Sequence, residues 1–275
     1  MTGDPSTKHA QAPLHLHGLW VHPIKSCAGI SVKEAVADSR GLVGDRRWMW
    51  IDDSGAFISQ RSHPALALVE PLVSGAGVTL RCGGVEPLVV APPPMDAPRL
   101  ALDVWGGACE GADAGDAAAL WLAKTLNIQA RLVVQRCRRD VDPSYAPGHE
   151  VGFADGFPLL VASAEAVAIV AERAGRVADA RRFRPNVVIA GGGAFVEDQW
   201  RRIAIGEVEI ELVKPCGRCG VLDVDPDKGV RDVGVLRALR PDRLLGGELR
   251  FGMNAVVTSP GRMRVGDTVE VLATR

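Results

Sequence analysis

The stretch that decides the fold runs from Glu209 to Gly229 and reads EIELVKPCGRCGVLDVDPDKG. It begins with apolar residues that alternate with glutamates, a pattern that predicts a strand with one buried face. Pro215 has no N–H group, so we expect the ladder of hydrogen bonds to stop there. Cys216 and Cys219 follow with two residues between them. A thiol pair on a constrained turn is suited to sulfur chemistry or to holding a soft metal.

Four interpretations of this thiol pair are open. The first is a buried structural pair. Zinc would need two more ligands, but the chain has no second CxxC and every histidine lies at or before His149. A thioredoxin-like motif should open a helix, and the sequence GVLDVDP after Cys219 is not a helix start. The fourth is one thiolate bound to a heavier, sulfur-loving metal, with Lys214 and Arg218 as neighbouring cations that favour the thiolate.

Length and composition exclude several classes of protein. The chain has 275 residues, 47% hydrophobic and 24% charged, which predicts a soluble globular protein of one large or two ordinary domains. A net charge of -1 argues against bulk nucleic-acid binding. Six cysteines without a regular framework indicate a reducing compartment rather than a disulfide scaffold, so we expect a cytoplasmic location. No signal segment or membrane-spanning apolar run is visible.

Short alternating segments dominate the chain and predict a mainly β fold with a few helices, of the α+β class. The clearest helices are expected to begin at Asp116 and Ser163, both good N-cap residues. A polar, arginine-containing stretch separates two β-rich halves. We therefore predict a disordered tail over residues 1–13 and domains over residues 14–136 and 137–275.

Three further stretches carry residues that suit an anion. Lys25 and Ser26 lie on a turn after a strand, where they offer a point charge and a hydroxyl donor to a phosphate. The sequence RFRPN, from Arg182 to Asn186, places arginines and an amide at a strand entrance. Arg46 follows an aspartate in GDRRW. The alternatives are a plain surface lysine, a solvated basic loop and a surface ion pair.

Taken together, these stretches resemble the molybdenum-cofactor sulfurase C-terminal (MOSC) domain family. The segments RFRPNVVI, FVEDQW and KPCGRC…VDPDKG match its motifs in order. The amino-terminal half is similar to the β-barrel region that precedes this domain in amidoxime-reducing proteins. The matched stretches extend from about Leu16 to Val271. The resemblance implies an N-terminal β-barrel-like domain followed by a MOSC β-barrel domain.

The resemblance also implies a site. In the family a molybdenum ion is held by the dithiolene of a phosphate-bearing pterin and by one protein cysteine, whose position here is Cys219. Cys219 is therefore the expected catalytic residue and metal ligand, and Cys216 is expected to support the site. A pocket between the two halves is expected, because the implied contacts come from both. The implied cofactor-binding residues are Lys25, Ser26, Arg46, Asp155, Arg184, Asn186, Arg218 and Asn254.

The activity implied by the resemblance is reduction of N-hydroxylated compounds, such as amidoximes and N-hydroxylated bases, by oxygen-atom transfer to the metal of the molybdenum cofactor (Mo-molybdopterin). No ferredoxin domain follows the MOSC segment. Electrons are then expected from a separate ferredoxin, cytochrome or flavoprotein. Two alternatives remain: a carrier of persulfide sulfur or of the cofactor that uses Cys219, and a non-enzymatic β-barrel protein with a structural CxxC.

Overall fold

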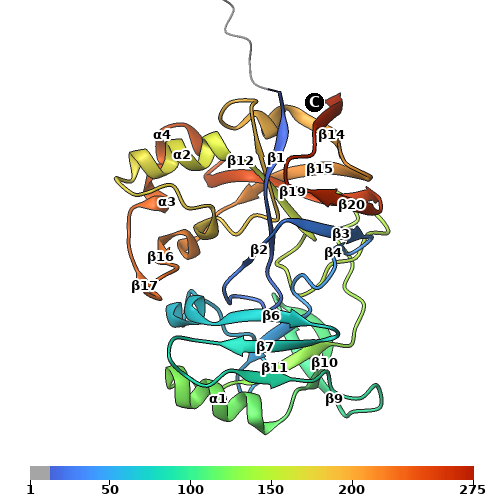
Figure 1. Ribbon diagram of the computed structural model, residues 1–275, viewed down its shortest axis with the longest axis vertical. Coiled ribbons are helices and arrows are strands. Elements are labelled where there is room, and N and C mark those ends of the chain that lie inside the picture. Colours follow the sequence, from blue (N-terminus) through green and yellow to red (C-terminus); the bar gives the residue numbers. More distant parts are fainter. Residues whose placement is uncertain (1–12) are drawn as a thin grey trace, which may run out of the picture.

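The computed structural model describes residues 13–275, so nearly all of the predicted tail, residues 1–13, falls outside the described residues. Figure 1 shows two lobes, one above the other. The upper lobe holds the elements coloured yellow to red together with blue strands from the beginning of the chain, and the lower lobe holds the elements coloured cyan to green. Several strands from the beginning of the chain therefore belong to the same lobe as its second half.

The upper lobe is built on a nine-stranded sheet. All neighbouring strands in it are antiparallel except β12 and β13. Its strands, in spatial order, are β2 (Ile30–Val32), β1 (His15–Val21), β13 (Val187–Ala190), β12 (Leu159–Ser163), β19 (Glu248–Ser259), β15 (Val208–Gly217), β14 (Trp200–Ile205) and β21 (Val269–Thr274), and β18 (Leu244–Leu245) pairs with β19.

Strand β1 joins the chain's beginning to its second half. Leu16 lies opposite Ile189 and Leu19 lies opposite Val187 of β13. Leu16 and Leu19 are fully buried in the core of the upper sheet. The turn that follows β1 carries Lys25, so this pairing fixes where the lysine lies relative to the second half.

The lower lobe is made of two smaller sheets around a separate core that includes Trp50 and Leu122. Its helix, α1 (Asp116–Leu126), packs Leu122 into this core. Its strands are β5 (Trp48–Ile51), β11 (Arg131–Gln135), β10 (Gly107–Asp113) and β9 (Arg99–Val104) in one sheet, and β6 (Glu70–Ser74), β7 (Gly77–Arg81) and β8 (Leu88–Val90) in the other. The remaining pairs are β20 (Gly261–Arg264) with β3 (Glu34–Asp38) and β4 (Gly41–Leu42), and β16 (Val224–Asp225) with β17 (Val230–Arg231).

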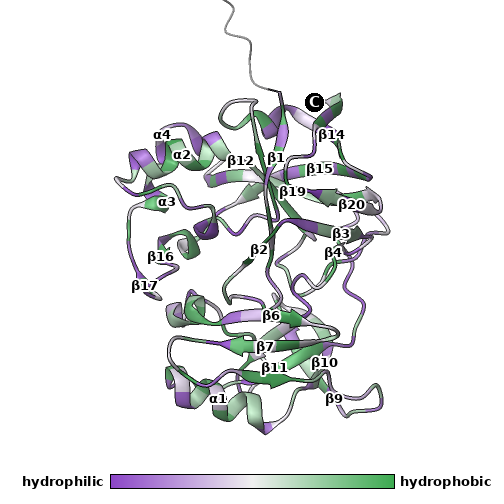
Figure 2. Ribbon diagram, in the orientation of Figure 1, coloured by the Kyte–Doolittle hydropathy of each residue, from purple (hydrophilic) through white to green (hydrophobic). Residues whose placement is uncertain are grey.

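Four α-helices occur in the described residues, α1, α2 (Ala164–Arg173), α3 (Val235–Ala238) and α4 (Arg240–Arg243). The prediction of a mainly β chain with a few helices is confirmed, although no sheet of the described residues closes into a full ring of paired strands. Figure 2 shows α1 and α2 with mixed hydrophilic and hydrophobic residues, as expected of helices that bury one face. None of the described helices is long and apolar enough to cross a membrane.

The two predicted helix starts differ in their caps. Gly115, with φ 94°, is the N-cap of α1, and Asp116 is the first helical residue instead. Ser163 is the N-cap of α2, as predicted, but its hydroxyl accepts a hydrogen bond from the Phe195 N–H at 2.9 Å and not from the helix. The donor that this hydroxyl meets therefore comes from a loop in another part of the chain and not from the first turn of α2.

The prediction that Pro215 ends the central strand is wrong. Strand β15 continues to Gly217, with Pro215 opposite Met253 of β19. The register shifts on both sides of the proline, between Leu212 and Lys214 and again before Gly217. Such bulges accommodate a residue without an N–H group. Cys216 is therefore the second-last residue of the strand, and Cys219 lies two residues after the strand ends.

One pair of cysteines, Cys109 and Cys137, forms a disulfide that the sequence analysis did not predict. The signal is hidden in the sequence because the partners are 28 residues apart and meet only when β10 pairs with β11. The other described cysteines are free: Cys27 and Cys82 are buried, Cys216 is partly exposed and Cys219 is exposed.

Candidate functional site

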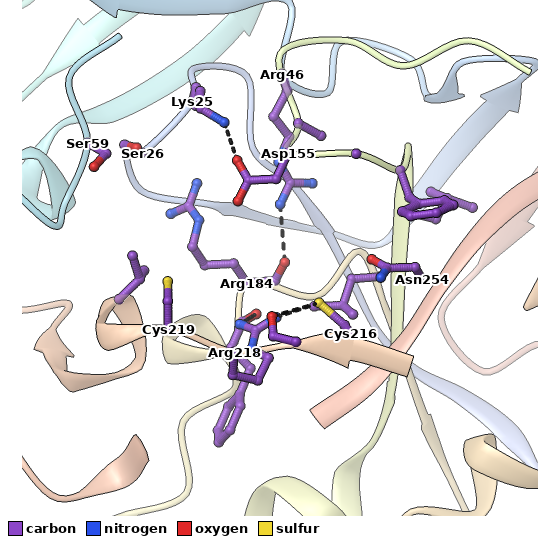
Figure 3. Close-up of a pocket in the computed structure, with 18 of the residues that line it drawn as sticks. Lys25, Ser26, Arg46, Ser59, Asp155, Arg184, Cys216, Arg218, Cys219 and Asn254 are labelled. Carbon is purple, nitrogen blue, oxygen red and sulfur yellow. Dashed lines mark hydrogen bonds and ion pairs between the residues drawn. The ribbon is translucent and has the colours of Figure 1, made fainter. Parts of the chain in front are cut away.

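A cavity of about 340 Å³ is lined by residues from both halves of the chain. Its volume falls at the small end of the range of small-molecule sites. The structure brings together every residue that the sequence analysis placed in the site: Lys25, Ser26, Arg46, Asp155, Arg184, Asn186, Arg218, Cys219 and Asn254 all line this cavity. Figure 3 shows Ser26 near Lys25, and Asn254 on the side of Cys216.

Backbone strain concentrates at this pocket. Six described residues other than glycine have a positive φ, and three of them line the cavity: Ser26 at 67°, Arg46 at 46° and Arg184 at 56°. Side chains with a Cβ seldom adopt this region, and such residues gather at functional sites, where surrounding contacts hold them. Three motifs that are distant in the sequence thus place a strained residue in one cavity.

The Cys219 thiol is exposed, and in Figure 3 its sulfur points into the pocket. The residue follows the end of β15 and precedes a short 3-10 turn, Gly220–Asp223. The Asp223 carboxylate fixes this turn, because Oδ1 accepts hydrogen bonds from the N–H groups of Gly234 and Leu236, each at 3.0 Å. Cys219 is therefore a reachable sulfur on an anchored turn, which suits a ligand to a soft metal.

The cations beside this thiol are not the predicted ones. Arg218 Nη1 lies 3.2 Å from the sulfur of Cys216, and Nη2 donates to the Phe183 carbonyl at 2.7 Å. The Lys214 ammonium lies 4.4 Å from the ring centroid of Tyr145. The cation in contact with Cys219 is Arg61, whose Nη1 is 4.0 Å from the sulfur.

Sequence reasoning missed Arg61 as a site residue. It comes from the lower lobe, in the segment after Ile58, while Cys219 comes from the upper one. The residues around Arg61 gave no role to the arginine, because its neighbour across the pocket is set by packing between the lobes.

Lys25 and Asp155 form an ion pair across the two halves of the chain. The Lys25 ammonium also donates to the Phe153 carbonyl at 2.9 Å, and burial lowers its pKa although Asp155 opposes that effect. Burial would raise the pKa of Asp155, but Lys25 and the Trp105 N–H, which donates at 3.0 Å, hold it below its ordinary value. Asp155 is therefore ionised at neutral pH, and this lysine already has a partner.

Arg46 is held in a buried network. Its Nη1 donates to Asp45 at 2.6 Å and to Asn186 Oδ1 at 2.9 Å, and its Nη2 donates to the Arg184 carbonyl at 3.2 Å. Asn186 is fully buried, and its Nδ2 donates to Asp45 at 3.0 Å and to the Trp20 carbonyl at 3.1 Å. These contacts make Asn186 a support for Arg46. Direct contact of Asn186 with a ligand stays a prediction.

Arg184 is a desolvated cation without a counter-ion. Its Nη1 donates to the Cys27 carbonyl at 2.5 Å, and it forms no salt bridge with another described residue. Burial, and then the neighbouring charge of Arg46, lower its pKa to about 10. Because burying an unpaired charge is costly, a negatively charged ligand would relieve the cost.

The pocket as a whole favours an anion. Two carboxylates line it, Asp155 and Glu248. Six cations face them, namely Lys25, Arg46, Arg61, Arg184, Lys214 and Arg218. Within the part of the chain that the structure describes, only Lys25 and Arg46 of these six form ion pairs. Unpaired guanidinium and ammonium groups at one cavity, with a free thiol among them, fit a ligand that joins a soft metal to a phosphate or similar anion.

Comparisons with known proteins agree with this arrangement. Residues 14–129 match the MOSC N-terminal beta barrel domain, and residues 148–270 match the MOSC domain. The chain is 34% identical to mitochondrial amidoxime-reducing component 1 of Mus musculus, over 92% of this chain and 81% of that protein. It is 32% identical to the Homo sapiens protein of the same name, over 92% and 82%.

A more distant relative is the molybdenum cofactor sulfurase of Drosophila pseudoobscura pseudoobscura, at 28% identity over 86% of this chain and 32% of that protein. The two domain matches, in this order, cover most of the described residues. Identity above 30% over four fifths of the mouse and human proteins leaves no doubt about kinship. The chain belongs to the family of MOSC-domain proteins with a MOSC N-terminal domain that includes the mitochondrial amidoxime-reducing components.

Proposed function

We propose that this protein binds the molybdenum cofactor (Mo-molybdopterin) through Cys219 and reduces N-hydroxylated compounds, such as amidoximes and N-hydroxylated bases. The observation that carries the proposal is the exposed thiol of Cys219 in a cavity where four cations lack a counter-ion. The names of the mouse and human relatives, amidoxime-reducing components, support the choice of substrate class. The sulfurase relative supports the choice of cofactor.

The donor set fits the cofactor at both of its ends. The soft metal would take the Cys219 thiolate as its protein ligand. The phosphate would be met by the unpaired guanidinium of Arg184 and by the hydroxyl of Ser26, with Arg46 holding the Arg184 backbone in place. The strained backbones at Ser26, Arg46 and Arg184 are the feature expected of residues fixed for contact with a ligand.

When bound, the cofactor supplies two-electron redox chemistry at a metal. Overall, the N–O bond of the substrate breaks, two electrons and two protons are consumed, and water leaves with the amidine or amine. The electrons come from a separate electron-transfer protein. The residues of this chain bind and orient the cofactor. The positive pocket holds an anionic cofactor, and the Lys25–Asp155 ion pair keeps one wall of the pocket polar beside it.

The direct test is to express the protein in a host that makes molybdenum cofactor and to quantify molybdenum and oxidised pterin. Near-stoichiometric amounts in the wild type, and a large loss in Cys219→Ala, are expected. The loaded protein should then reduce benzamidoxime to benzamidine with a chemical electron donor. Absence of both molybdenum and pterin from the wild type would contradict the proposal.

A sulfur-carrying role uses the same thiol and is separated by a second measurement. If Cys219 carries a persulfide, cyanide treatment should release sulfane sulfur as thiocyanate from the wild type but not from Cys219→Ala. Sulfane sulfur without molybdenum would favour that role. Molybdenum with amidoxime reduction would favour the reductase.

A further inference from the structure

We propose that Arg61 is a substrate-binding residue whose guanidinium receives the oxygen of the N–O group beside Cys219, and that Trp105 is the residue that positions it. The inference rests on the proposed function and deepens it. It predicts that substrates are selected by the N–O oxygen that accepts hydrogen bonds from the guanidinium, so that hydroxamic acids and N-oxides bind better than the same molecules without that oxygen.

Arg61 is the cation in contact with the Cys219 thiol, and it has N–H donors without a described acceptor. Its described side-chain contacts are the Cys219 sulfur, at 4.0 Å, and two aromatic rings. It forms no ion pair with any residue that the structure describes. A guanidinium carries five N–H donors in a fixed plane, so most of those of Arg61, which lines the cavity, have no acceptor among the described residues. The other arginines of the pocket each donate to a protein carbonyl: Arg46 to Arg184, Arg184 to Cys27 and Arg218 to Phe183.

Trp105 stands at the tip of the β9–β10 hairpin, where Val104 lies opposite Gly107. The two loop residues, Trp105 and Gly106, have φ values of 62° and 76°. Two positive φ values in a two-residue loop define a type I′ turn, which favours asparagine or glycine. A bulky tryptophan is a costly choice for the first position. Strain of this kind persists where other contacts hold the residue.

The contacts that hold Trp105 are made with residues that line the pocket. The Trp105 N–H donates to Asp155 at 3.0 Å, and its ring centroid lies 5.1 Å from that of Phe57. The Arg61 guanidinium carbon lies over the indole, 4.3 Å from the ring centroid. Cation–π contact of this type is favourable and fixes the plane of a guanidinium without using its N–H donors. The indole therefore orients Arg61 and leaves its hydrogen-bonding capacity for a ligand.

The backbone of Arg61 is fixed from the opposite lobe. Arg231, on β17, donates through Nη2 to the Arg61 carbonyl at 2.5 Å. Ser59 Oγ accepts a hydrogen bond from the Arg61 N–H at 3.3 Å. Backbone and side chain are both held, while the end of the side chain has no described carboxylate partner. That combination is expected of a residue preorganised to bind an oxygen that arrives beside Cys219.

The test measures binding without turnover, on cofactor-loaded protein in the absence of an electron donor. Benzohydroxamic acid and benzamide, which differ by the N–O oxygen alone, are titrated by calorimetry into the wild type, Arg61→Gln, Arg61→Lys and Trp105→Phe. Exposed Arg201 on β14 supplies the matched control, Arg201→Gln, which removes the same charge away from the pocket. Molybdenum and pterin content are measured on every sample.

Arg61→Gln should lower the affinity for benzohydroxamic acid by roughly tenfold or more, which is the size expected for the loss of a charge-assisted hydrogen bond. Benzamide affinity and cofactor content should not change, and Arg61→Lys should recover part of the loss. Trp105→Phe, which keeps a ring but loses the N–H to Asp155, should give a smaller loss that is again confined to benzohydroxamic acid. Arg201→Gln should match the wild type.

Two results for Arg61→Gln would overturn this inference alone. One is an equal loss of affinity for benzohydroxamic acid and benzamide, and the other is an unchanged affinity for benzohydroxamic acid. Loss of molybdenum or pterin from Arg61→Gln, with full content in the wild type, would also overturn it, because Arg61 would then be a contact of the cofactor. A wild-type protein without molybdenum overturns the proposed function, and this inference with it.

Discussion

Arg218 donates to the sulfur of Cys216 over 3.2 Å, so the cation between the two cysteines is committed to the first of them. The second, Cys219, is exposed in the pocket and is approached by an arginine from the other lobe. The two thiols therefore have different surroundings in spite of their symmetrical motif. This difference gives the first prediction.

Cys216→Ala should keep its molybdenum and pterin, because the thiol that faces the ligand is untouched. The variant should lose about 1 kcal/mol of unfolding free energy, since Arg218 loses a weak acceptor at a partly exposed position. Metal analysis and urea unfolding of the variant, beside Cys219→Ala, check both statements. Equal loss of metal in the two variants would show that Cys216 is also a ligand.

Arg184→Gln should separate cofactor binding from stability. It removes a desolvated cation that has no described counter-ion, so the cofactor-free variant should unfold within about 1 kcal/mol of the cofactor-free wild type. Its cofactor content should fall by a large factor, because an anion loses its partner.

Arg181→Gln is the matched control for Arg184→Gln. Arg181 bridges Asp179 and Asp227 outside this pocket. That variant should keep its cofactor. Pterin and metal analysis of both variants decide the matter, and full occupancy in Arg184→Gln would contradict the prediction.

Asp155→Asn should destabilise the protein by about 1–2 kcal/mol near neutral pH, because buried Lys25 loses its counter-ion. The folded pKa of Asp155 is below its unfolded value, so its stabilisation is present above about pH 4 and fades as the pH falls further. The difference in unfolding free energy between variant and wild type should therefore become smaller below about pH 4. Urea unfolding across a pH series measures it, with Asp155→Asn/Lys25→Met expected to close the gap at all pH values.

Glu197→Gln should remove a slope in the stability of the wild type. Glu197 is fully buried, and burial raises its pKa to about 7. The folded state then binds the extra proton between the unfolded pKa, about 4.3, and 7, so wild-type stability falls as pH rises through that window and levels above it. Denaturant midpoints of the variant should vary less over this range. A parallel pH dependence in both proteins would refute the assignment.

Much of the fold was accessible from the sequence because period-two patterns and turn residues mark short strands reliably. Pairing was not accessible: nothing in the residues from His15 to Val21 indicates β13 as their partner. The continuation of the strand through Pro215 was also missed, because the two bulges that accommodate a residue without an N–H group cannot be seen in the sequence. The division of the chain at residue 136 stays a prediction.

The site was reached through motifs, and all nine residues line one cavity. The motifs did not predict which side chains contact one another. Arg218 lies beside the sulfur of Cys216 and not that of the expected ligand Cys219, and neither Arg61 nor Trp105 was given a role from the sequence. The contact of Arg61 with Cys219 depends on how the two lobes meet, which is a property of packing and not of local sequence.

The pairing of β1 with β13 has a consequence for how the protein matures. Leu19 finds its neighbour Val187 only after most of the polypeptide has left the ribosome, and such distant pairings form late in folding. The turn with Lys25 and Ser26 follows β1 directly, so it reaches Asp155 and Arg184 only once that strand is docked. A nascent chain therefore has no complete cavity, and we expect any ligand of this cavity, the proposed cofactor included, to bind only after synthesis of the polypeptide is finished.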